Sequence, residues 1–453
     1  MNISRINRIN KLLKLWVIPI LLCIFVGLSI FNTYRIVSGL INKENHSVLS
    51  NSNVINSVSD SSNGLISNDE KSSHDQDRNS IGKIKEVDND LKHTLDEISS
   101  SYGATGVQVA IIKNGVVYEC YNYGSADKSK GLPVTTETVF RSASLSKLID
   151  ALAVMKLSEE GIIDIDNDIG DYLGYRVRNK KYSNIAITPR MLMSHTSSII
   201  DSQNFLSSRN NNSSTPLNKL LSQATSYSGN RPGNKHNYSN FGIAVLTAAV
   251  EKKTGIPLYE YTEKQLFQPL GIKGSFLASR INDSTSIANL YNTSGNVSYS
   301  VKRQLREKCQ NELGQTHHIY QGNITISAAD YAKMLCVLLN NGTGENGEQI
   351  LSSESVNEIL KIQYQSGTTS CCLCNYISDS IIKGRTMHYH TGSNFGMYSS
   401  FAFDTSDLSG VVVLTSGANA KKEKSGIYNI CGDIIRTVYE RQSQGYYPYS
   451  TSM

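Results

Sequence analysis

Residues 144–157 read SLSKLIDALAVMKL, and this stretch decides how the chain folds. From Leu145 onward, apolar side chains recur at i, i+3, i+4 and i+7, and most of the positions between them are apolar as well. A helix that is apolar on nearly every face belongs in a core rather than on a surface. The stretch therefore predicts a buried central helix that begins at Ser144 and ends near Gly161.

β-rich runs lie on both sides of this helix. Residues 107–113 and 116–123 are joined by Asn114-Gly115, which is the strongest short signal of a hairpin, and 397–403 and 410–416 form a second pair. Helical patterns occupy residues 85–102, 244–254, 327–340 and 424–442, and Thr188-Pro189 fits a helix start. We therefore expect an α+β fold, an α/β sandwich. Its antiparallel sheet would be built from both ends of the domain and flanked by helices, with an inserted mainly helical region.

The positive charge is concentrated at the start of the chain. Residues 1–40 hold five Lys or Arg residues and no acid, which equals the formal net charge of +5 of the whole chain, so the remaining residues sum to zero. A nucleic-acid partner needs a clustered basic face. The neutral body therefore argues against nucleic-acid binding.

The segment Leu15–Tyr34 is a run of 20 uncharged, mostly apolar residues. About 20 helical residues cross a hydrocarbon core, and four cations before the run against one after it favour a cytoplasmic N-terminus. We expect a single-pass signal-anchor at the cell membrane with an extracytoplasmic body. A cleaved signal peptide is the alternative, and it also exports the body.

The residues after the apolar run suggest a tether. Between residues 41 and 80, 19 of 40 residues are Ser or Asn and none is aromatic, so this stretch cannot bury a core. The expected organisation is a cytoplasmic basic segment at 1–14, a transmembrane anchor at 15–34, a disordered Ser/Asn-rich tether at 35–82, the folded domain at 83–442 and a tail at 443–453.

Seven cysteines follow the apolar run, and three of them, Cys371, Cys372 and Cys374, are nearly adjacent. This density is compatible with a surface disulfide, with free thiols or with a metal site, although a zinc site would need a fourth ligand that the spacing does not identify. We predict no metal and no cofactor.

The candidate nucleophile is Ser144, with Lys147 three residues further on the same helix face. A lysine buried among apolar layers loses solvation, so it can accept a proton, and the positive end of the helix favours an alkoxide. Ser-x-x-Lys also occurs at Ser80, Ser125 and Ser380, but in the tether, in a loop and in an expected strand. These settings do not bring the two side chains together.

Two further motifs supply polar side chains. Tyr238-Ser239-Asn240 directly precedes a buried helix, where Tyr238 can relay protons and Asn240 can bind a substrate amide. His390-Thr391-Gly392 lies on an expected strand, where Gly392 permits close approach of a substrate backbone. His390 can hold a carboxylate when protonated or donate a hydrogen bond when neutral. The backbone N–H groups of Ser144 and Ser393 would form an oxyanion hole.

With these three motifs in this order, the chain resembles the penicillin-recognising serine hydrolases of the class C β-lactamase, D-Ala-D-Ala carboxypeptidase and esterase type. The resemblance spans about residues 95–440 and also rests on Phe140–Ser144, Ile163–Asp166, Thr188–Thr196, Pro232-Gly233 and Leu270–Ile272. The last motif is the His-Thr-Gly variant. The chain departs from the family pattern at Ser198, where a glycine is usual, and at Gly322-Asn323-Ile324.

The resemblance implies a role for each motif residue. Ser144 would be acylated, Lys147 and Tyr238 would transfer protons in an order that the sequence leaves open, and Asn240 would orient the substrate. His390, Thr391 and Gly392 would form the carboxylate side.

We expect a penicillin-binding D-Ala-D-Ala carboxypeptidase whose partner is a peptidoglycan stem peptide or a β-lactam. A class C-like β-lactamase is the alternative. An esterase, a D-amino-acid peptidase and a non-turnover sensor of β-lactams or wall fragments remain open.

Overall fold

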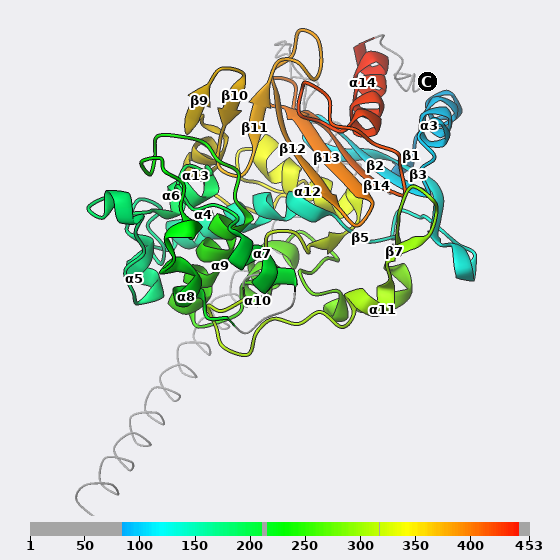
Figure 1. Cartoon of the computed structure of the whole chain (residues 1–453). Coiled ribbons are helices and arrows are strands. Elements are labelled where there is room, and N and C mark those ends of the chain that lie inside the picture. Colours follow the sequence, from blue (N-terminus) through cyan, green and yellow to red (C-terminus); the bar gives the residue numbers. More distant parts are fainter. Residues whose placement is uncertain (1–83, 211–214, 317, 444–453) are drawn as a thin grey trace, which may run out of the picture. The chain divides into compact units, whose positions relative to one another are not determined.

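A computed structural model describes residues 84–210, 215–316 and 318–443 (Figure 1). The expected anchor, the tether and most of the tail lie outside these residues. Within the described ranges, no helix is long and apolar enough to span a membrane.

A ten-stranded sheet runs through the molecule in the order β1-β3-β2-β14-β13-β12-β11-β10-β9, and β4 pairs with β3 beside this path. The strands are β1 (Lys85–Glu86), β2 (Gly106–Lys113), β3 (Val116–Asp127), β4 (Leu132–Pro133), β9 (Tyr364–Ser366), β10 (Thr369–Cys371), β11 (Tyr376–Ser378), β12 (Met387–Asn394), β13 (Met397–Asp404) and β14 (Ser409–Ser416). Strands from the two ends of the domain meet where β2 pairs with β14, as the sequence predicts.

The sheet is mixed rather than purely antiparallel. All of its pairs are antiparallel except β1, which runs parallel to β3 at the edge. Helix α3 (Asn89–Ser101) lies between β1 and β2 in the sequence. Because this helix separates β1 from the β2–β3 hairpin, β1 can pair with β3 in the parallel direction. Two small antiparallel pairs, β5 (Phe140–Arg141) with β8 (Thr325–Ile326) and β6 (Leu290–Tyr291) with β7 (Val297–Tyr299), lie outside the sheet.

Helices cover both faces of the sheet (Figure 1). Val109 of β2 and Val413 of β14 face one side, where they join a cluster with apolar residues of α3 and α14 (Asn429–Ser443). Ala110 and Val412 face the opposite side and join the larger core. Successive residues of a strand point to opposite faces, and both faces here are covered, so these strands read as continuous apolar runs.

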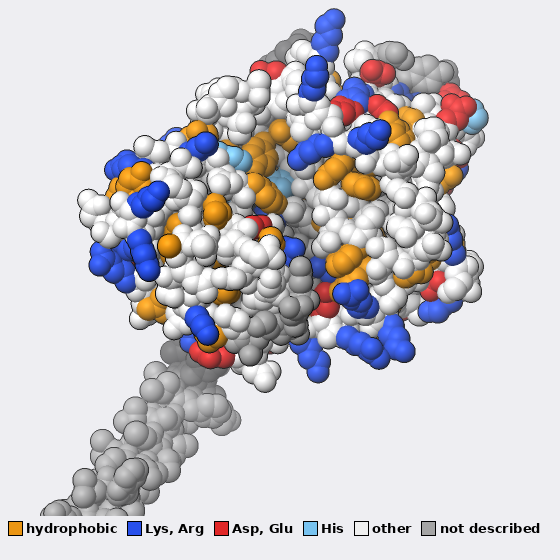
Figure 2. Space-filling view, viewed as in Figure 1, with side chains coloured by type: hydrophobic (Ala, Val, Ile, Leu, Met, Phe, Trp, Pro, Cys, Tyr) orange, Lys and Arg blue, Asp and Glu red, His pale blue; other side chains and the backbone are white. Residues whose placement is uncertain are grey.

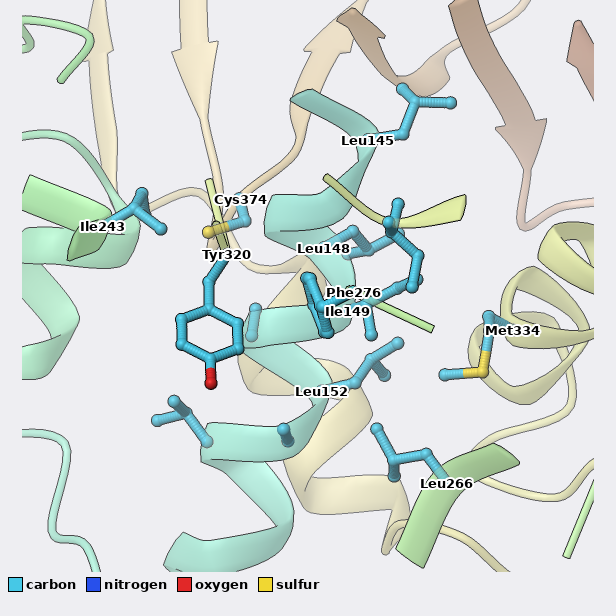
Figure 3. Close-up of a cluster of buried hydrophobic side chains, with 14 of the residues drawn as sticks. Leu145, Leu148, Ile149, Leu152, Ile243, Leu266, Phe276, Tyr320, Met334 and Cys374 are labelled. Carbon is cyan, nitrogen blue, oxygen red and sulfur yellow. The ribbon is translucent and has the colours of Figure 1, made fainter. Parts of the chain in front are cut away.

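The larger core is centred on α4 (Ser146–Glu159), and Figure 3 shows its side chains beside residues from several other segments. Leu148, Ile149 and Leu152 of α4 are 0–1% exposed. The other helices are α5 (Ile169–Leu173), α6 (Pro189–Met193), α7 (Gln203–Asn210), α8 (Leu217–Leu221), α9 (Asn240–Thr254), α10 (Leu258–Thr262), α11 (Val301–Gln304), α12 (Ala328–Leu339) and α13 (Ser353–Leu360). The buried central helix that the sequence predicts is confirmed.

Local signals placed several other elements correctly. Asn114 and Gly115 have φ values of 51° and 74°, which a two-residue hairpin turn of the I′ type requires. Thr188 caps α6 by accepting a hydrogen bond from the Met191 N–H, with Pro189 in the first turn.

Two local expectations were wrong. α14 begins at Asn429 rather than near Lys424, because the Glu423 N–H bonds to the Ile427 carbonyl and shapes this segment as a loop. Residues 380–382 form a bend and Lys383 begins a turn, so this stretch is not a strand.

Candidate active site

Ser144 lies in a single 3₁₀ turn, η4 (Ala143–Leu145), between the short strand β5 and helix α4. Ala143 has a φ of 53°, so the chain turns sharply just before Ser144 through a conformation that non-glycine residues rarely adopt. Ser144 keeps partial exposure, whereas its neighbours Ala143 and Leu145 are buried. The turn thus presents one hydroxyl at the edge of an apolar core.

Lys147 reaches this hydroxyl from the first turn of α4. Its Nζ lies 3.1 Å from the Ser144 Oγ and donates to the carbonyl of Gln321 at 2.5 Å. The Lys147 side chain is 0% exposed and forms no ion pair with a carboxylate of residues 84–210, 215–316 or 318–443. A buried amine in contact with a hydroxyl is suited to proton exchange with it.

Tyr238 approaches Ser144 from another segment, just before α9. Its hydroxyl donates to the Ser144 Oγ at 2.8 Å, and the Lys147 Nζ lies 5.1 Å from the centre of its ring. The ring also packs against His195, with 4.5 Å between ring centres. Tyr238 and His390 lie far from Ser144 and from each other in the sequence, and their ring centres are 6.2 Å apart.

The His390-Thr391-Gly392 motif lies on β12, which passes directly beside the Ser144 turn. A Cβ added at Gly392 would lie 2.4 Å from the Ser399 Oγ, 2.7 Å from the Ser142 carbonyl oxygen and 2.9 Å from the Ser144 nitrogen. Gly392 is therefore required for the close approach of two backbones, rather than for an unusual φ. This approach also brings the strand that carries Ser393 next to Ser144, where an oxyanion hole is expected.

His390 is a neutral imidazole in this setting. It is 3% exposed, and burial, with a contribution from the charge of Lys147, lowers the pKa of His390 to about 3. Its Nδ1 lies 2.8 Å from the Thr391 carbonyl oxygen, which it can contact only as a donor. The Nε2 is then an acceptor, and it has no hydrogen-bond partner among the described residues. Two roles were expected for His390. A protonated ring that binds a carboxylate does not fit this buried environment. A neutral ring fits it, but its Nε2 would accept a hydrogen bond rather than donate one.

Asn240 is engaged by a residue that the sequence did not single out. Its Nδ2 donates to Asp201 at 2.7 Å, and Asp201 also accepts hydrogen bonds from the Phe241 N–H and the Ser239 hydroxyl. Asp201 thus satisfies free donors at the start of α9 and fixes the amide of Asn240. Its role had no recognisable signal in the sequence, because it lies in a loop 37 residues before Tyr238.

Aromatic side chains and histidines gather around these groups. The His236 Nε2 lies 3.1 Å from the Tyr376 hydroxyl, and the Tyr376 ring centre lies 5.6 Å from that of His390. His195 is buried and accepts a hydrogen bond from the Ser239 N–H at Nδ1, and burial lowers its pKa well below the usual value. Figure 2 shows a hollow in this face of the molecule, with histidine and hydrophobic side chains inside it and lysines or arginines on one rim.

The three clustered cysteines are buried thiols. All seven cysteines in the described ranges are free, and no group of three metal-binding side chains occurs there. Cys371 donates to the Ser194 carbonyl and Cys374 to the Met193 carbonyl. Of the three alternatives for these cysteines, the described residues therefore fit free thiols. The thiols of Cys371 and Cys374 lie against the backbone just before His195.

The chain was compared with known proteins and structures. A family model described as Beta-lactamase matches residues 89–430. Protein flp of Staphylococcus aureus (strain MRSA252) is 25% identical over 195 residues, which are 42% of this chain and 38% of that protein. Esterase EstB of Burkholderia gladioli is 28% identical over 204 residues, 40% of this chain and 50% of the esterase. The matched stretches thus span half or less of these relatives.

Solved structures share the fold at low sequence identity. The octameric penicillin-binding protein homologue of Pyrococcus abyssi superposes with a TM-score of 0.62 at 20% identity, over 80% of this chain and 78% of that one. The D-amino acid amidase of Ochrobactrum anthropi SV3 gives 0.61 at 19% identity, over 79% and 100%. The β-lactamase/D-alanine carboxypeptidase of Pseudomonas syringae gives 0.59 at 18% identity, over 80% and 99%.

Proposed function

Because the chain belongs to the Beta-lactamase family of serine hydrolases, we propose that it forms an acyl-enzyme on Ser144 and acts as a penicillin-binding D-Ala-D-Ala carboxypeptidase. The observation that carries the proposal is the position of the Ser144 Oγ, 3.1 Å from the Lys147 Nζ and 2.8 Å from the Tyr238 hydroxyl. Two proton-exchanging groups on one serine are the arrangement that an acyl transfer needs.

Acylation then proceeds by proton transfers among these three side chains. The Ser144 Oγ attacks the carbonyl carbon of the substrate while its proton passes to Lys147 or Tyr238. The backbone N–H groups of Ser144 and Ser393 stabilise the oxyanion. As the bond to the departing D-alanine breaks, its amine takes up a proton from Tyr238, and where Lys147 has received the Ser144 proton, Lys147 passes that proton on to Tyr238. Water then hydrolyses the ester and restores the Ser144 hydroxyl.

The carboxylate of such a substrate needs a positive charge nearby. His390 does not supply it, because burial lowers its pKa to about 3. Lys147 and Lys422 are the cations whose charges act on His390 among the described residues. Lys147 is bound to Ser144 and Gln321, whereas Lys422 is exposed and forms no ion pair with a described carboxylate. The proposal therefore assigns the substrate carboxylate to Lys422, with Thr391 donating a hydrogen bond.

The neutral His390 also favours a second candidate function. An uncharged acceptor suits an ester or amide substrate without a carboxylate, as in an esterase or a D-amino-acid amidase. The partial sequence match to Esterase EstB is in line with this candidate. A class C-like β-lactamase uses the same Ser144 acylation and differs in how fast the penicilloyl ester is hydrolysed.

We also propose that the folded domain lies on the outer side of the cell membrane, where a carboxypeptidase would meet peptidoglycan. The 20-residue apolar run at 15–34 and the cations before it support an anchored, extracytoplasmic domain. Cell fractionation of the full chain and of a variant that lacks residues 1–34 tests this proposal, since only the full chain should stay with the membrane after a high-salt wash.

The test of the reaction uses the full purified chain, labelled penicillin and two matched peptides. We expect covalent labelling of the wild type and none of Ser144→Ala. We also expect D-alanine release from a peptide that ends in D-Ala-D-Ala, and release of D-alaninamide from its C-terminal amide that is at least about 10-fold slower. Equal labelling of Ser144→Ala would exclude Ser144 as the nucleophile. Faster turnover of the amide would favour the esterase or amidase candidate.

A further inference from the structure

The strands β9, β10 and β11 extend the sheet beyond β12, the strand that carries the His390 motif (Figure 1). Two of their tyrosines, Tyr364 on β9 and Tyr376 on β11, are partly exposed. Neither ring belongs to the apolar clusters that form the core of the described residues. The proposed reaction gives neither tyrosine a role, so both rings are available for a ligand.

A series of ring contacts joins these two tyrosines to the candidate active site. It starts at Tyr238, which donates to the candidate nucleophile and whose ring centre lies 6.2 Å from that of His390. The Tyr376 ring centre lies 5.6 Å from that of His390 and 5.6 Å from that of His236. His236 in turn stacks on Tyr364, with 6.3 Å between the ring centres. These spacings are typical of aromatic pairs that attract each other.

His236, Tyr364 and Tyr376 form what we call the aromatic wall. The His236 Nε2 and the Tyr376 hydroxyl lie 3.1 Å apart, and this hydrogen bond fixes the two rings at an angle of 75°. Burial lowers the pKa of His236, so its ring is uncharged at neutral pH. The strand register places Cys371 opposite both Tyr364 and Tyr376, so the backbone holds the two tyrosines in one row. A surface fixed in this way loses little freedom when it binds a ligand.

The wall lies on the side of the departing group of the substrate. In the proposed reaction, Tyr238 protonates the departing amine, and Thr391 and Lys422 hold the carboxylate of the same departing residue. Both assignments place this residue beside His390, which contacts the Tyr238 ring, directly precedes Thr391 and senses the charge of Lys422. Tyr376 is the part of the wall that contacts His390. The side chain of the departing residue is therefore the part of the substrate that meets the wall.

The chemistry of the wall suits a flat apolar group. Its three rings are uncharged at neutral pH, and the Tyr376 hydroxyl is already engaged by His236. A methyl side chain on the departing residue would leave the rings in contact with water, whereas an aromatic side chain would cover them. Figure 2 shows a hollow in which histidine side chains lie beside hydrophobic ones, a class that includes tyrosine in that view.

We propose that the aromatic wall binds the side chain of the departing residue, and that this side chain is itself an aromatic ring. The enzyme would then release an aromatic D-amino acid more efficiently than D-alanine. The peptide bond that breaks and the ester that forms on Ser144 are those of the proposed reaction. The inference rests on the proposed function for the place of the departing residue, and it adds the class of side chain that this residue carries.

A pair of matched peptides tests this preference on the full purified chain. The peptides differ only in their last residue, so that one ends in D-Ala-D-Ala and the other in D-Ala-D-Phe. We expect kcat/KM to be at least about 5-fold higher for the release of D-phenylalanine, and we expect this ratio to fall below about twofold in Tyr364→Leu. A wild-type ratio near one, or a Tyr364→Leu ratio equal to that of the wild type, would overturn the proposal.

Tyr118→Leu is the matched control, because Tyr118 is a partly exposed tyrosine of β3, near the opposite edge of the same sheet. This variant should keep both wild-type rates. Tyr376 separates the ring from its hydroxyl: Tyr376→Phe should keep a ratio above about threefold, whereas Tyr376→Leu should lose it. An equal loss in both Tyr376 variants would assign the effect to the hydrogen bond with His236 and would contradict a contact between rings.

Binding to Ser144→Ala, which cannot be acylated at this position, separates the inference from the proposed reaction. Titration calorimetry should give a dissociation constant for the D-Ala-D-Phe peptide that is at least about 5-fold lower than for the D-Ala-D-Ala peptide. If the wild type hydrolyses neither peptide while this difference is found, the proposed reaction fails and the aromatic wall is supported. Equal dissociation constants, or no binding of the D-Ala-D-Phe peptide, would refute the wall even if both peptides were hydrolysed.

Discussion

At the scale of single residues, Ser198 occupies a position that favours glycine. Its φ is 67°, which lies in the left-handed region, and its hydroxyl accepts a hydrogen bond from the Asn179 Nδ2 at 3.1 Å. A Cβ in the left-handed region costs roughly 1 kcal/mol. The hydroxyl contact offsets part of this strain.

The strain can be measured by comparing two variants that both lack the hydroxyl. Ser198→Gly should unfold with a free energy about 1 kcal/mol larger than Ser198→Ala, since only alanine keeps the strained Cβ. Urea unfolding of both proteins gives the difference. Equal stabilities would show that the backbone relaxes at this position.

Gly392 is critical for a different reason, which is the space between two backbones. In Gly392→Ala, the new Cβ would lie 2.7 Å from the Ser142 carbonyl oxygen and 2.9 Å from the Ser144 nitrogen, so the Ser144 turn must shift. We expect penicillin labelling to slow at least about 10-fold, because small displacements at a reacting centre are costly. In the control Gly229→Ala, the new Cβ would meet only the Lys181 Nζ at 3.5 Å, so labelling should keep its wild-type rate.

At the scale of elements, the segment that links β10 to β11 is held in the core by backbone carbonyls. Cys371 donates to the Ser194 carbonyl just after α6, Cys374 to the Met193 carbonyl at the end of α6, and Asn375 to the Ile359 carbonyl. Burial raises the pKa of Cys372 to about 12 and those of Cys371 and Cys374 further. Thiolates are therefore scarce in this segment at neutral pH.

This burial predicts how the thiols react. In the native protein, Cys371, Cys372 and Cys374 should resist iodoacetamide at about pH 8, and modification should become complete in about 6 M urea. Mass spectrometry of the peptides identifies the modified sites. The partly exposed Cys309 is the internal comparison and should react first. Rapid native modification of Cys371 or Cys374 would show that the segment opens readily.

Element predictions succeeded where the signal was local. The α4 period, the Asn114-Gly115 turn and the Thr188-Pro189 helix start depend on neighbouring residues alone, and the structure contains all three. The parallel pairing of β1 depends on where a distant strand lies, and the late start of α14 depends on a hydrogen-bonded loop. Such contacts leave no periodic pattern in the sequence.

At the scale of the whole molecule, histidines buried without charge limit stability in acid. Burial lowers the pKa of His388 to about 4 and that of His390 to about 3. In the unfolded chain a histidine takes up a proton near pH 6.5, whereas these two stay neutral in the folded protein until about pH 4 and pH 3. The unfolded state thus binds more protons below pH 6.5, and the free energy of unfolding falls as the pH falls from there.

Each such histidine should contribute up to about 1.4 kcal/mol per pH unit to this fall. His388→Gln should therefore show a shallower decline of unfolding free energy between about pH 6.5 and 4 than the wild type. Urea unfolding at several pH values measures the slopes. His93, which is 76% exposed, is the control, and His93→Gln should keep the wild-type slope. An unchanged slope in His388→Gln would mean that His388 is accessible to protons in the folded state.

The sequence by itself determined the buried central helix, the central hairpin and the identity of the candidate site residues Ser144, Tyr238 and His390. These features follow from apolar periodicity, turn chemistry and residue identity, all of which are properties of short segments. The tertiary structure alone decided which groups meet. It set the contacts of Ser144 with Lys147 and Tyr238 and the binding of Asn240 by Asp201. Charge state depends on burial and on neighbours distant in sequence, and for that reason the loss of charge on His390 became visible only in the folded chain.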